Sequence, residues 1–211
     1  MRFKAVQVLV VVLAMIVAIS ASIAAQEPPA GGRGGAQGGP GGGQGRGGGG
    51  GGRGGPGLTL TSTAWPDGGE IPQRHAGGAM GISPALTWTN VPMGTVEFVL
   101  IMNDPEPVTP RGSATGDILH WMVVKIPAAT TSLPEGAGSA GGQLPAGARQ
   151  VRTYAGPGAP AAGPQHHYTL TLYALNAPLE LAENADRAAV MAAMEGKVLA
   201  RGIFNGRYKQ P

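Results

Sequence analysis

The sequence contains no cysteine. This absence excludes disulfide bonds, a thiol nucleophile and a lipid-modified cysteine, so an exported domain of this chain must be held together by its hydrophobic core. Signatures of common enzymes are missing as well: no serine lies in a Gly-x-Ser-x-Gly turn, and no phosphate-binding loop or dinucleotide-binding fingerprint is present. We therefore expect no enzyme activity and no cofactor. The lack of an Asn-x-Ser/Thr acceptor favours a bacterial envelope protein over one from a glycosylating pathway.

The first 57 residues have the composition of an export signal followed by a linker. Arg2 and Lys4 precede an apolar run and then small residues through Ala25, so residues 1–25 are predicted to be a secretory signal peptide, with an uncleaved membrane anchor as the alternative. Residues 26–57 are dominated by glycine, carry three arginines and offer nothing to bury. We expect a disordered linker, a periplasmic or secreted location in a bacterium, and membrane contact only through the signal or the linker.

The charge of the chain is unevenly distributed. The formal net charge is +3, but from residue 58 onward ten Lys and Arg stand against eleven Asp and Glu, a difference of −1. A folded domain so close to neutrality gives no reason to expect a polyanion as its partner. The Arg-Gly-Gly character of the linker is also typical of RNA-binding segments. Behind an export signal this interpretation lacks a partner, and we expect no nucleic-acid binding.

Residues 58–211 have the pattern of one mainly β domain. Short segments of alternating or continuous apolar character are separated by Gly- and Pro-rich turns, and these segments are 58–62, 86–89, 98–102, 118–126 and 166–175. A helix is expected from an Asn184 cap to about Leu199, with Ala188, Met191, Met194 and Val198 as its apolar stripe. A turn and a short strand should end the chain. Because strands and helices do not alternate, a mainly antiparallel sheet or sandwich is expected.

Polar side chains stand where these strands meet loops. In 166–175 a period of two puts Tyr168, Leu170, Leu172 and Ala174 on one face, and the same period places His166 there, beside the loop that begins at Gly156. Asp104 follows the apolar run 98–102, with Glu106 two residues further on. His120 interrupts an apolar face expected to hold Met122, Val124 and Ile126, with Trp121 on the opposite face. Taken from the strand 166–175 alone, a surface histidine pair beside a turn is the simpler interpretation.

An acidic group near two imidazoles permits three interpretations. The group resembles a metal site with two histidines and one carboxylate, an acid–base pair, or an anion pocket in which Asp104 fixes the tautomer of a histidine. The metal interpretation is the weakest, because no close His-x-His or His-x-x-x-His spacing is present. We expect no metal ion.

Several motifs occur in an order that is specific for one family. Asp104-Pro-Glu-Pro107, then His120-Trp121, then Gly156-Pro157 and His166-x-Tyr168, ending in Leu172-Tyr-Ala-Leu175, resemble the phosphatidylethanolamine-binding proteins, and within them the bacterial branch described as Raf-kinase-inhibitor-like. Supporting pieces are Ser83-Pro84 before Trp88 and Leu133-Pro-Glu-Gly136. The resemblance covers Leu58 to Tyr208. It implies a β-sandwich of two antiparallel sheets with Greek-key links, one or two peripheral helices and a small anion pocket at one end.

The resemblance also assigns residues to this pocket. Carried over one by one, the ligand-binding residues would be Asp104, Pro105, Glu106, His120, Gly156, Pro157, His166 and Tyr168. His120 and His166 would donate hydrogen bonds, Asp104 would orient a histidine, and the Gly156 region would supply backbone N–H groups. The chain departs from the family pattern at Glu106, where an Asp is usual, and at His167, where another basic residue is usual. These departures bear on the shape of the pocket and its choice of ligand.

The function expected from this resemblance is that of an exported binding module for a small anion, such as a phosphate or a phospholipid head group. One alternative is a protein-interaction or inhibitor module that acts on an envelope protease or a kinase-like partner through the irregular segment Thr130–Tyr154. A hydrolase that uses His120 and Asp104 is the weakest hypothesis, because the sequence offers it neither a nucleophile nor a set of metal ligands.

Overall fold

The computed structural model describes residues 57–77, 80–107 and 116–211. The predicted signal peptide and all of the predicted linker before Gly57 lie outside the described residues. The elements are β1 (Thr59–Thr61), β2 (Gly69–Glu70), η1 (Gln73–His75), β3 (Leu86–Thr89), β4 (Glu97–Asp104), β5 (Ile118–Pro127), β6 (Ser132–Leu133), β7 (Arg149–Arg152), β8 (His166–Leu175), α1 (Arg187–Met194) and β9 (Val198–Tyr208). No helix within these described ranges is long and apolar enough to cross a membrane.

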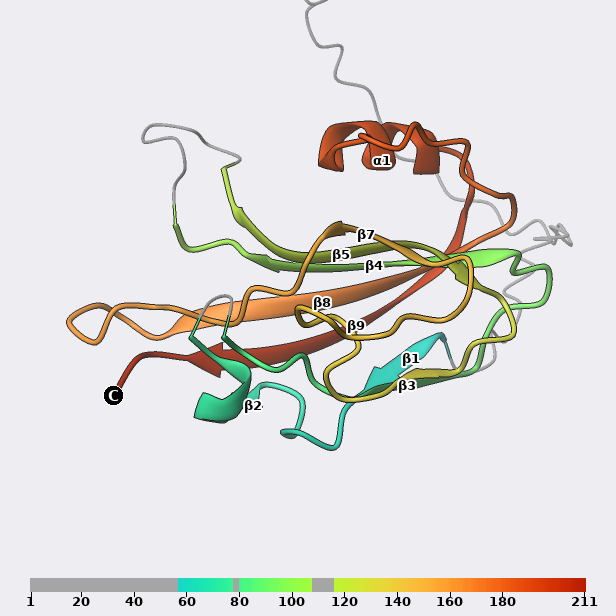
Figure 1. The fold of residues 1–211 in the computed structure, drawn as a ribbon. Coiled ribbons are helices and arrows are strands. Elements are labelled where there is room, and N and C mark those ends of the chain that lie inside the picture. The colour runs from blue at the N-terminus through green and yellow to red at the C-terminus, as the bar shows by residue number, and fades with distance from the viewer. Residues whose placement is uncertain (1–56, 78–79, 108–115) are drawn as a thin grey trace, which may run out of the picture. The chain divides into compact units, whose positions relative to one another are not determined.

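The strands form two sheets, as the sequence predicted. The smaller sheet has the order β1-β3-β6, and the larger has the order β2-β9-β8-β4-β5-β7. All pairs are antiparallel except the short pairing of β2 with β9. Figure 1 shows the smaller sheet on one face of the larger sheet and α1 on the other. The chain crosses between the sheets from β3 to β4, and again on either side of β6.

Two hydrophobic cores lie on the two faces of the larger sheet. The inner core fills the space between the sheets and takes Phe98, Leu100 and Met102 from β4. The outer core takes the alternate residues Val99 and Ile101 and is covered by α1. β4 is therefore buried on both faces, which is why its sequence reads as one continuous apolar run.

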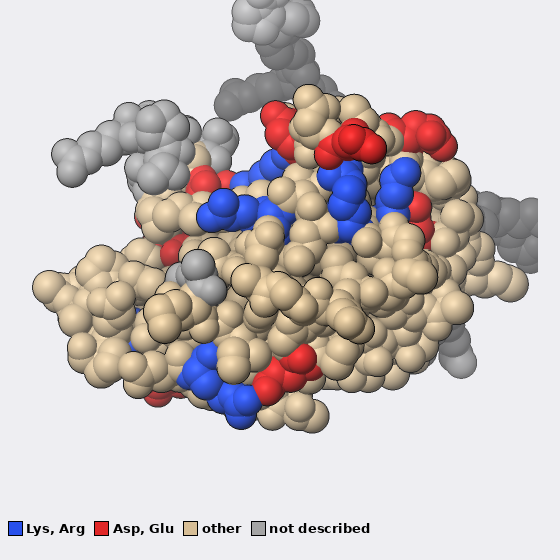
Figure 2. All heavy atoms as spheres, in the orientation of Figure 1, with Lys and Arg blue, Asp and Glu red and all other residues tan. Residues whose placement is uncertain are grey.

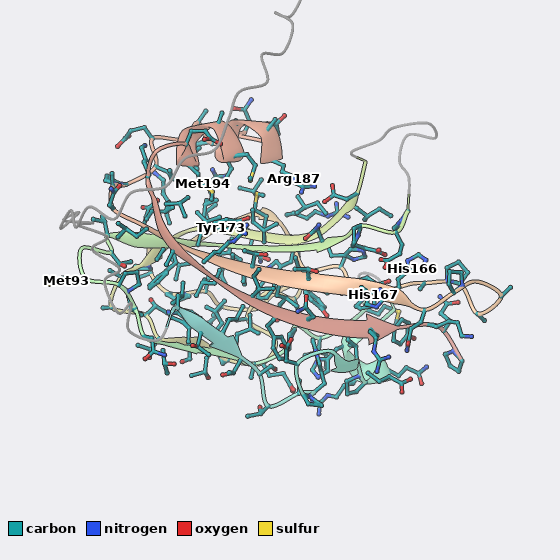
Figure 3. All side chains as sticks on the ribbon, turned by 180° about the vertical axis from the view of Figure 1, so that it is seen from behind. Met93, His166, His167, Tyr173, Arg187 and Met194 are labelled. Atoms are coloured by element: carbon teal, nitrogen blue, oxygen red, sulfur yellow. The ribbon has the colours of Figure 1, made fainter. Side chains whose placement is uncertain are left out.

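The helix α1 is fixed by its cap and by two buried side chains. Asp186 is the N-cap, and its side chain accepts a hydrogen bond from the N–H of Ala189 at 2.9 Å. Val190 and Met194 pack into the outer core, and burial of each contributes about 1.5–3 kcal/mol. Met194 lies between the helix and the sheet in Figure 3.

Two predictions about the end of the chain were wrong. The helix is capped by Asp186, two residues after the expected cap, and it ends at Met194, because Glu195 leaves the helical conformation and Gly196 adopts a φ of 74°. Val198 therefore belongs to the eleven-residue strand β9 and not to the helix. The expected short terminal strand is this long strand, which pairs with β8 along its whole length.

Strand β5 does not keep a strict alternation. Its register against β4 shifts at two places, and Lys125 has a φ of 57°, as a residue of a β-bulge can. Trp121 and Ile126 both belong to the inner core, while Met122 belongs to the outer core. The prediction that put Ile126 with Met122, opposite Trp121, was wrong because it assumed an unbroken period of two.

The segment from Thr130 to Tyr154 is more ordered than its composition predicted. β6 forms one edge of the smaller sheet and β7 one edge of the larger sheet. Between them, Ala137 is buried, and an added Cβ at Gly138 would lie 2.3 Å from the indole of Trp121. This part of the chain therefore covers sheet edges and packs on the inner core.

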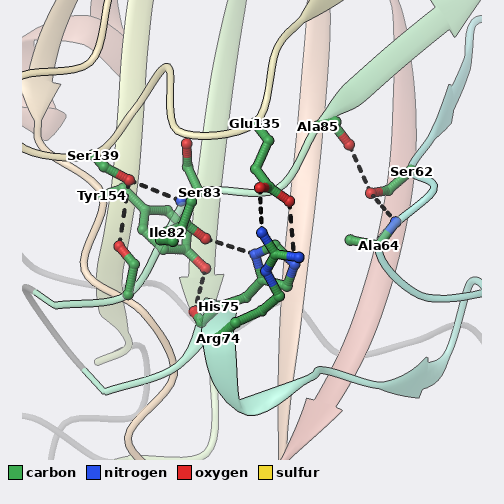
Figure 4. A network of polar contacts seen from close by, with 11 residues as sticks. Ser62, Ala64, Arg74, His75, Ile82, Ser83, Ala85, Glu135, Ser139 and Tyr154 are labelled. Atoms are coloured by element: carbon green, nitrogen blue, oxygen red, sulfur yellow. Dashed lines mark hydrogen bonds and ion pairs between the residues drawn. The ribbon is translucent and has the colours of Figure 1, made fainter.

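A largely buried polar network fastens η1 to the segment before β3 and to Tyr154, which follows β7 (Figure 4). We call it the His75 network, and its members are His75, Ile82, Ser83, Ser139 and Tyr154. The Nδ1–H of His75 donates to the carbonyl of Ile82 at 2.6 Å, and the hydroxyl of Tyr154 donates to the carbonyl of His75 at 2.7 Å. The hydroxyl of Ser139 accepts the N–H of Ser83 at 2.9 Å. Each of these buried groups has a partner, as a rigid interior requires.

Charged side chains do not form a surface of one sign on the visible face. Figure 2 shows basic and acidic groups together near α1 and again at the opposite margin, with a broad uncharged area between them. The guanidinium of Arg149 donates hydrogen bonds to the backbone carbonyls of Ala182 and Glu183. On this face the charges are mixed, in keeping with the near-neutral count for residues 58–211.

Candidate functional site

Asp104 and His166 come together because β4 and β8 are neighbours. Asp104 continues the inward-facing series of β4, and His166 starts the inward-facing series of β8. The Nδ1–H of His166 donates to Oδ2 of Asp104 at 2.8 Å. Asp104 is only 2% exposed, and burial raises the pKa of its carboxyl group although the hydrogen bond from His166 opposes the shift. A period of two in each strand thus places a carboxylate and an imidazole at one end of the inner core.

A second carboxylate–histidine pair lies beside the first, closer to solvent. The side chain of Glu106 accepts hydrogen bonds from the backbone N–H of His167 at 3.0 Å and from its Nδ1 at 2.6 Å. Burial alone would raise the pKa of Glu106, but hydrogen bonding, above all from the side chain of His167, outweighs burial and the pKa is lowered. The backbone N–H of Glu106 also donates to Oδ1 of Asp104 at 3.1 Å. Together these contacts hold the turn after β4 against the start of β8, where Figure 3 labels both histidines.

His120 reaches the same place because of a β-bulge in β5. Met102 pairs with Trp121 and the following Asn103 pairs with Leu119, so His120 is an additional residue in the ladder. Its ring meets the ring of Tyr168 edge to face, with centroids 5.1 Å apart. The bulge turns His120 toward the inner core, whereas strict alternation had placed it on the opposite face from Trp121.

The hydrogen bonding of His120 determines what its ring can do. Nδ1 lies 2.6 Å from the carbonyl oxygen of Ala155. A carbonyl only accepts, so Nδ1 carries the proton, and Nε2 of the neutral ring is an acceptor. Burial lowers the pKa of His120, so the neutral form prevails near pH 7. Nε2 has no hydrogen-bond partner among the described residues, which is an unfavourable state for a buried polar atom.

These side chains surround a cavity of about 440 Å³. Tyr168 forms part of its wall, with its ring centroid 6.5 Å from that of His166. Burial and the nearby carboxylate of Asp104 raise the pKa of Tyr168, so its hydroxyl group keeps its proton. The hydroxyl oxygen accepts the N–H of Gly158 at 3.3 Å. The rest of the lining is mostly apolar and consists of Pro107, Ile118, Ala155, Gly156, Gly158, Ala159 and Pro160.

The sequence-predicted site residues fall into two groups. Asp104, His120, Gly156, His166 and Tyr168 line the cavity. The cavity lining does not include Pro105, Glu106 and Pro157, which are sequence neighbours of the lining residues Asp104 and Gly156. Gly156 packs against backbone, since an added Cβ would lie 2.5 Å from the carbonyl oxygen of His75.

Sequence reasoning missed two features of this site. It did not identify the apolar wall residues Ile118 and Ala159, although Ala159 belongs to the Gly- and Pro-rich loop that the sequence had placed next to the strand. It also missed the carbonyl of Ala155 as the partner of His120, because 35 residues separate the two groups along the chain.

One cluster in the described part of the chain has the spacing of metal ligands. Single ligand atoms of Asp104, Glu106 and His166 lie within 4.8 Å of one another. Within the cluster, the imidazole of His166 donates to Asp104, and the backbone N–H of Glu106 donates to the same carboxylate. The carboxylate of Glu106 accepts from His167, which lies outside the cluster.

Residues 61–209 match the family model described as phosphatidylethanolamine-binding protein. The chain belongs to this family. YbhB of Escherichia coli strain K12 is 40% identical over 129 residues, which cover 56% of this chain and 78% of YbhB. A protein of Methanothermobacter thermautotrophicus is 35% identical over 159 residues, which cover 72% of this chain and 99% of that protein.

A solved structure supports the same fold. The crystal structure of Escherichia coli YbcL, described as a member of the mammalian PEBP family, matches with a TM-score of 0.64 and 29% identity over 73% of this chain and 99% of YbcL. The family match includes every described residue that lines the cavity, from Asp104 to Tyr168. The chain is therefore a bacterial-type family member with a mainly β fold and, as for the family in general, a ligand-binding module.

Proposed function

We propose that this family member is an exported module that binds a small anion, a phosphate- or carboxylate-bearing head group, in the cavity between Asp104, His120 and His166. The observation that carries the proposal is the convergence of three strands on one cavity that contains a buried nitrogen, Nε2 of His120, with no partner among the described residues. An unpaired buried polar atom in a cavity is relieved when a ligand supplies its partner. The volume of about 440 Å³ is in the range of small-molecule sites.

Polar and apolar residues of the lining would contact different parts of the ligand. The hydroxyl group of Tyr168 can donate to a ligand oxygen, and Nε2 of His166 can donate when that ring is protonated, because its Nδ1 is engaged with Asp104. The apolar residues around them suit the organic part of a head group. The described lining contains no Ser, Thr, Lys or Cys. We propose binding without turnover, since the described lining lacks the serine, threonine, cysteine and lysine nucleophiles that an adjacent base activates.

Export is part of the proposal and rests on the order of residues at the start of the chain. Arg2 and Lys4 precede the apolar run, which is the arrangement of a secretory signal. With no cysteine in the chain, attachment through a lipid-modified cysteine is not available. The module would then work outside the cytoplasm as a free or tethered domain.

Calorimetric titration with inorganic phosphate and with phosphorylethanolamine at pH 5.5 and pH 8 tests this proposal. We expect binding that is weaker at pH 8, because the ligand loses its second proton over this range and the dianion would meet the acceptor groups of Asp104 and His120. His120→Ala and His166→Ala should each weaken binding about tenfold or more, as expected when a charge-assisted hydrogen bond is lost. His167→Gln is the matched control, because this exposed histidine of the same strand does not line the cavity. Equal affinities for His120→Ala and the parent protein would contradict the proposal.

A further inference from the structure

The polar groups at the base of the cavity accept hydrogen bonds more readily than they donate them. The carboxylate of Asp104 is an acceptor, and the hydrogen bond from Nδ1 of His120 to Ala155 makes Nε2 of the neutral ring a second acceptor. The amide N–H of Gly158 is already engaged with the hydroxyl oxygen of Tyr168. An anion without a proton of its own would meet lone pairs at these two positions.

We propose that the cavity selects oxyanions that bring their own acidic proton, namely hydrogen phosphate and phosphate monoesters, over phosphate diesters and sulfate, with Nε2 of His120 accepting the hydrogen bond from the ligand's P–OH. This inference rests on the proposed function and names its ligand class. A monoester has a second ionisation near pH ~6, so its monoanion with one P–OH makes up about half of the ligand at pH ~6 and about a tenth at neutral pH. A diester anion and sulfate have no such proton.

The surroundings of His120 oppose the alternative, in which the protein supplies the proton. Burial lowers the pKa of His120, and Arg152 on β7 and His166 on β8 act in the same direction. The carbonyl of Ala155 and the carboxylate of Asp104 on β4 favour the protonated ring but do not reverse the shift. Tyr168, which faces the ring from β8, stays neutral because burial raises its pKa. A diester could therefore bind only if the imidazole of His120 also took up a proton from solution. The lowered pKa of His120 makes this uptake unfavourable.

The two cases differ in the number of protons exchanged. When a monoester monoanion binds to neutral His120, the complex gains no proton from the buffer. When a diester binds, His120 must be protonated to face the ligand oxygen, and one proton per ligand leaves the buffer. The difference appears as a buffer-dependent enthalpy of binding, so it can be measured without any mutation.

The experiment compares methyl phosphate, dimethyl phosphate, sulfate and ethanolamine by calorimetry at pH 6.0, in two buffers that differ in ionisation enthalpy. We expect methyl phosphate to bind about tenfold or more tightly than dimethyl phosphate or sulfate, with uptake of about half a proton, contributed by its dianionic fraction. Dimethyl phosphate should take up nearly one proton. Above pH ~6 the affinity for methyl phosphate should fall about tenfold per pH unit, because the dianion must first be protonated.

A substitution at the acceptor sharpens the test. His120→Gln places an amide near the position of Nε2, and this amide can donate to the ligand. The preference for methyl phosphate should fall below about threefold in this variant, whereas His167→Gln should keep the parent preference. If His120→Gln does not fold, the proton uptake of the parent protein decides the matter alone.

The possible outcomes separate this inference from the proposed function. Comparable affinity for methyl phosphate, dimethyl phosphate and sulfate, each with uptake of one proton, would overturn the inference and leave an anion pocket. Binding of none of the three anions, or of ethanolamine in their place, would overturn both. Preference for the monoester without the expected difference in proton uptake would also overturn the inference, because the selection would then have another cause.

Discussion

Two buried histidines in this protein share the same local chemistry and differ in what lies around them. His75 and His120 are 1% and 8% exposed, and each donates from Nδ1 to a backbone carbonyl at 2.6 Å. Nε2 of His75 lies 4.0 Å from a carboxylate oxygen of Glu135. Nε2 of His120 has no partner in the described chain, and its ring lines a cavity.

This difference separates a structural histidine from a candidate binding residue. Burial and one good hydrogen bond are common to both rings, so neither feature identifies a site. The distinguishing features are the second nitrogen and the space next to it. Nε1 of Trp88 is also buried without a partner among the described residues, but Trp88 does not line the cavity around His120. An unpaired atom and a cavity together are more informative than either alone.

The surroundings of His75 form one region of the molecule, and the cavity around His120 forms the other. Among the substitutions, His75→Ala is expected to have the largest effect on stability. The substitution removes the partner of the carbonyl of Ile82 and leaves a void beside Trp65, so the free energy of unfolding should fall by about 3 kcal/mol. Chemical denaturation measures this loss. Phosphate affinity of the folded fraction should remain that of the parent protein.

The control is Arg74→Ala, because Arg74 is the exposed neighbour of His75 and pairs only with the exposed Glu135. A surface pair of this kind contributes about 0–1 kcal/mol. If His75→Ala were no more destabilising than Arg74→Ala, the structural role assigned to His75 would be wrong.

The next largest effect on stability is expected from Gly156→Ala. Gly156 packs against the backbone of His75 and also lines the cavity around His120. A Cβ at this position would lie 2.5 Å from the carbonyl oxygen of His75 and 2.9 Å from the backbone of Ala76. Backbone must move, at a cost of about 1–3 kcal/mol, and the cavity wall should move with it. We expect lower stability by thermal denaturation together with weaker phosphate binding.

Gly158→Ala is the matched control for stability, since an added Cβ there has nothing within 4 Å. Its free energy of unfolding should stay within about 0.5 kcal/mol of the parent value or rise slightly, because alanine restricts the unfolded chain. Equal destabilisation by the two alanines would mean that the close packing of Gly156 does not connect the two regions.

The smallest expected effect is a pH dependence of stability that belongs to His120. Its pKa is lower in the folded protein than in the unfolded chain. Below pH ~6.5 the unfolded chain binds the proton first, so the folded state loses up to about 1.4 kcal/mol per pH unit as the pH falls. His120→Asn keeps a donor toward Ala155 but cannot titrate, so the difference in stability between parent and variant should change between pH 7 and pH 5.

The titration of Asp104 does not account for the expected pH dependence of the stability difference between the parent protein and His120→Asn. The pKa of Asp104 is raised, so its contribution to stability is lost as the pH rises, which is the opposite direction. The largest cause of this shift is burial, which is common to both proteins, so most of the contribution cancels in the difference. Parallel stability curves for the parent and His120→Asn would show that the folded protein does not hold His120 in its neutral form.

Much of the site could be predicted from periodicity. Asp104 and His166 continue inward-facing series in β4 and β8, and a period of two is enough to put both on the same face. The residue motifs then indicated the family. The periodicity uses information that lies within about ten consecutive residues. The family resemblance depends instead on the order of several motifs between Asp104 and Leu175.

What could not be predicted depends on contacts between distant segments. The bulge that turns His120 inward appears only when β5 is paired with β4. The role of its Nε2 depends on the carbonyl of Ala155, which a sequence pattern does not reveal, so the ring had been expected to donate. The helix start was misplaced because Asn184 and Asp186 are equally good capping residues, and only the fold selects Asp186.

The central claim, that the cavity around His120 and His166 binds a small anion, is tested most directly by a histidine-selective NMR titration with inorganic phosphate at pH 6.5. The imidazole signals of His120 and His166 should shift together and saturate with one affinity, while the signals of His75 should stay in place. Equal shifts for His75 and His120, or no shift for either, would contradict the claim.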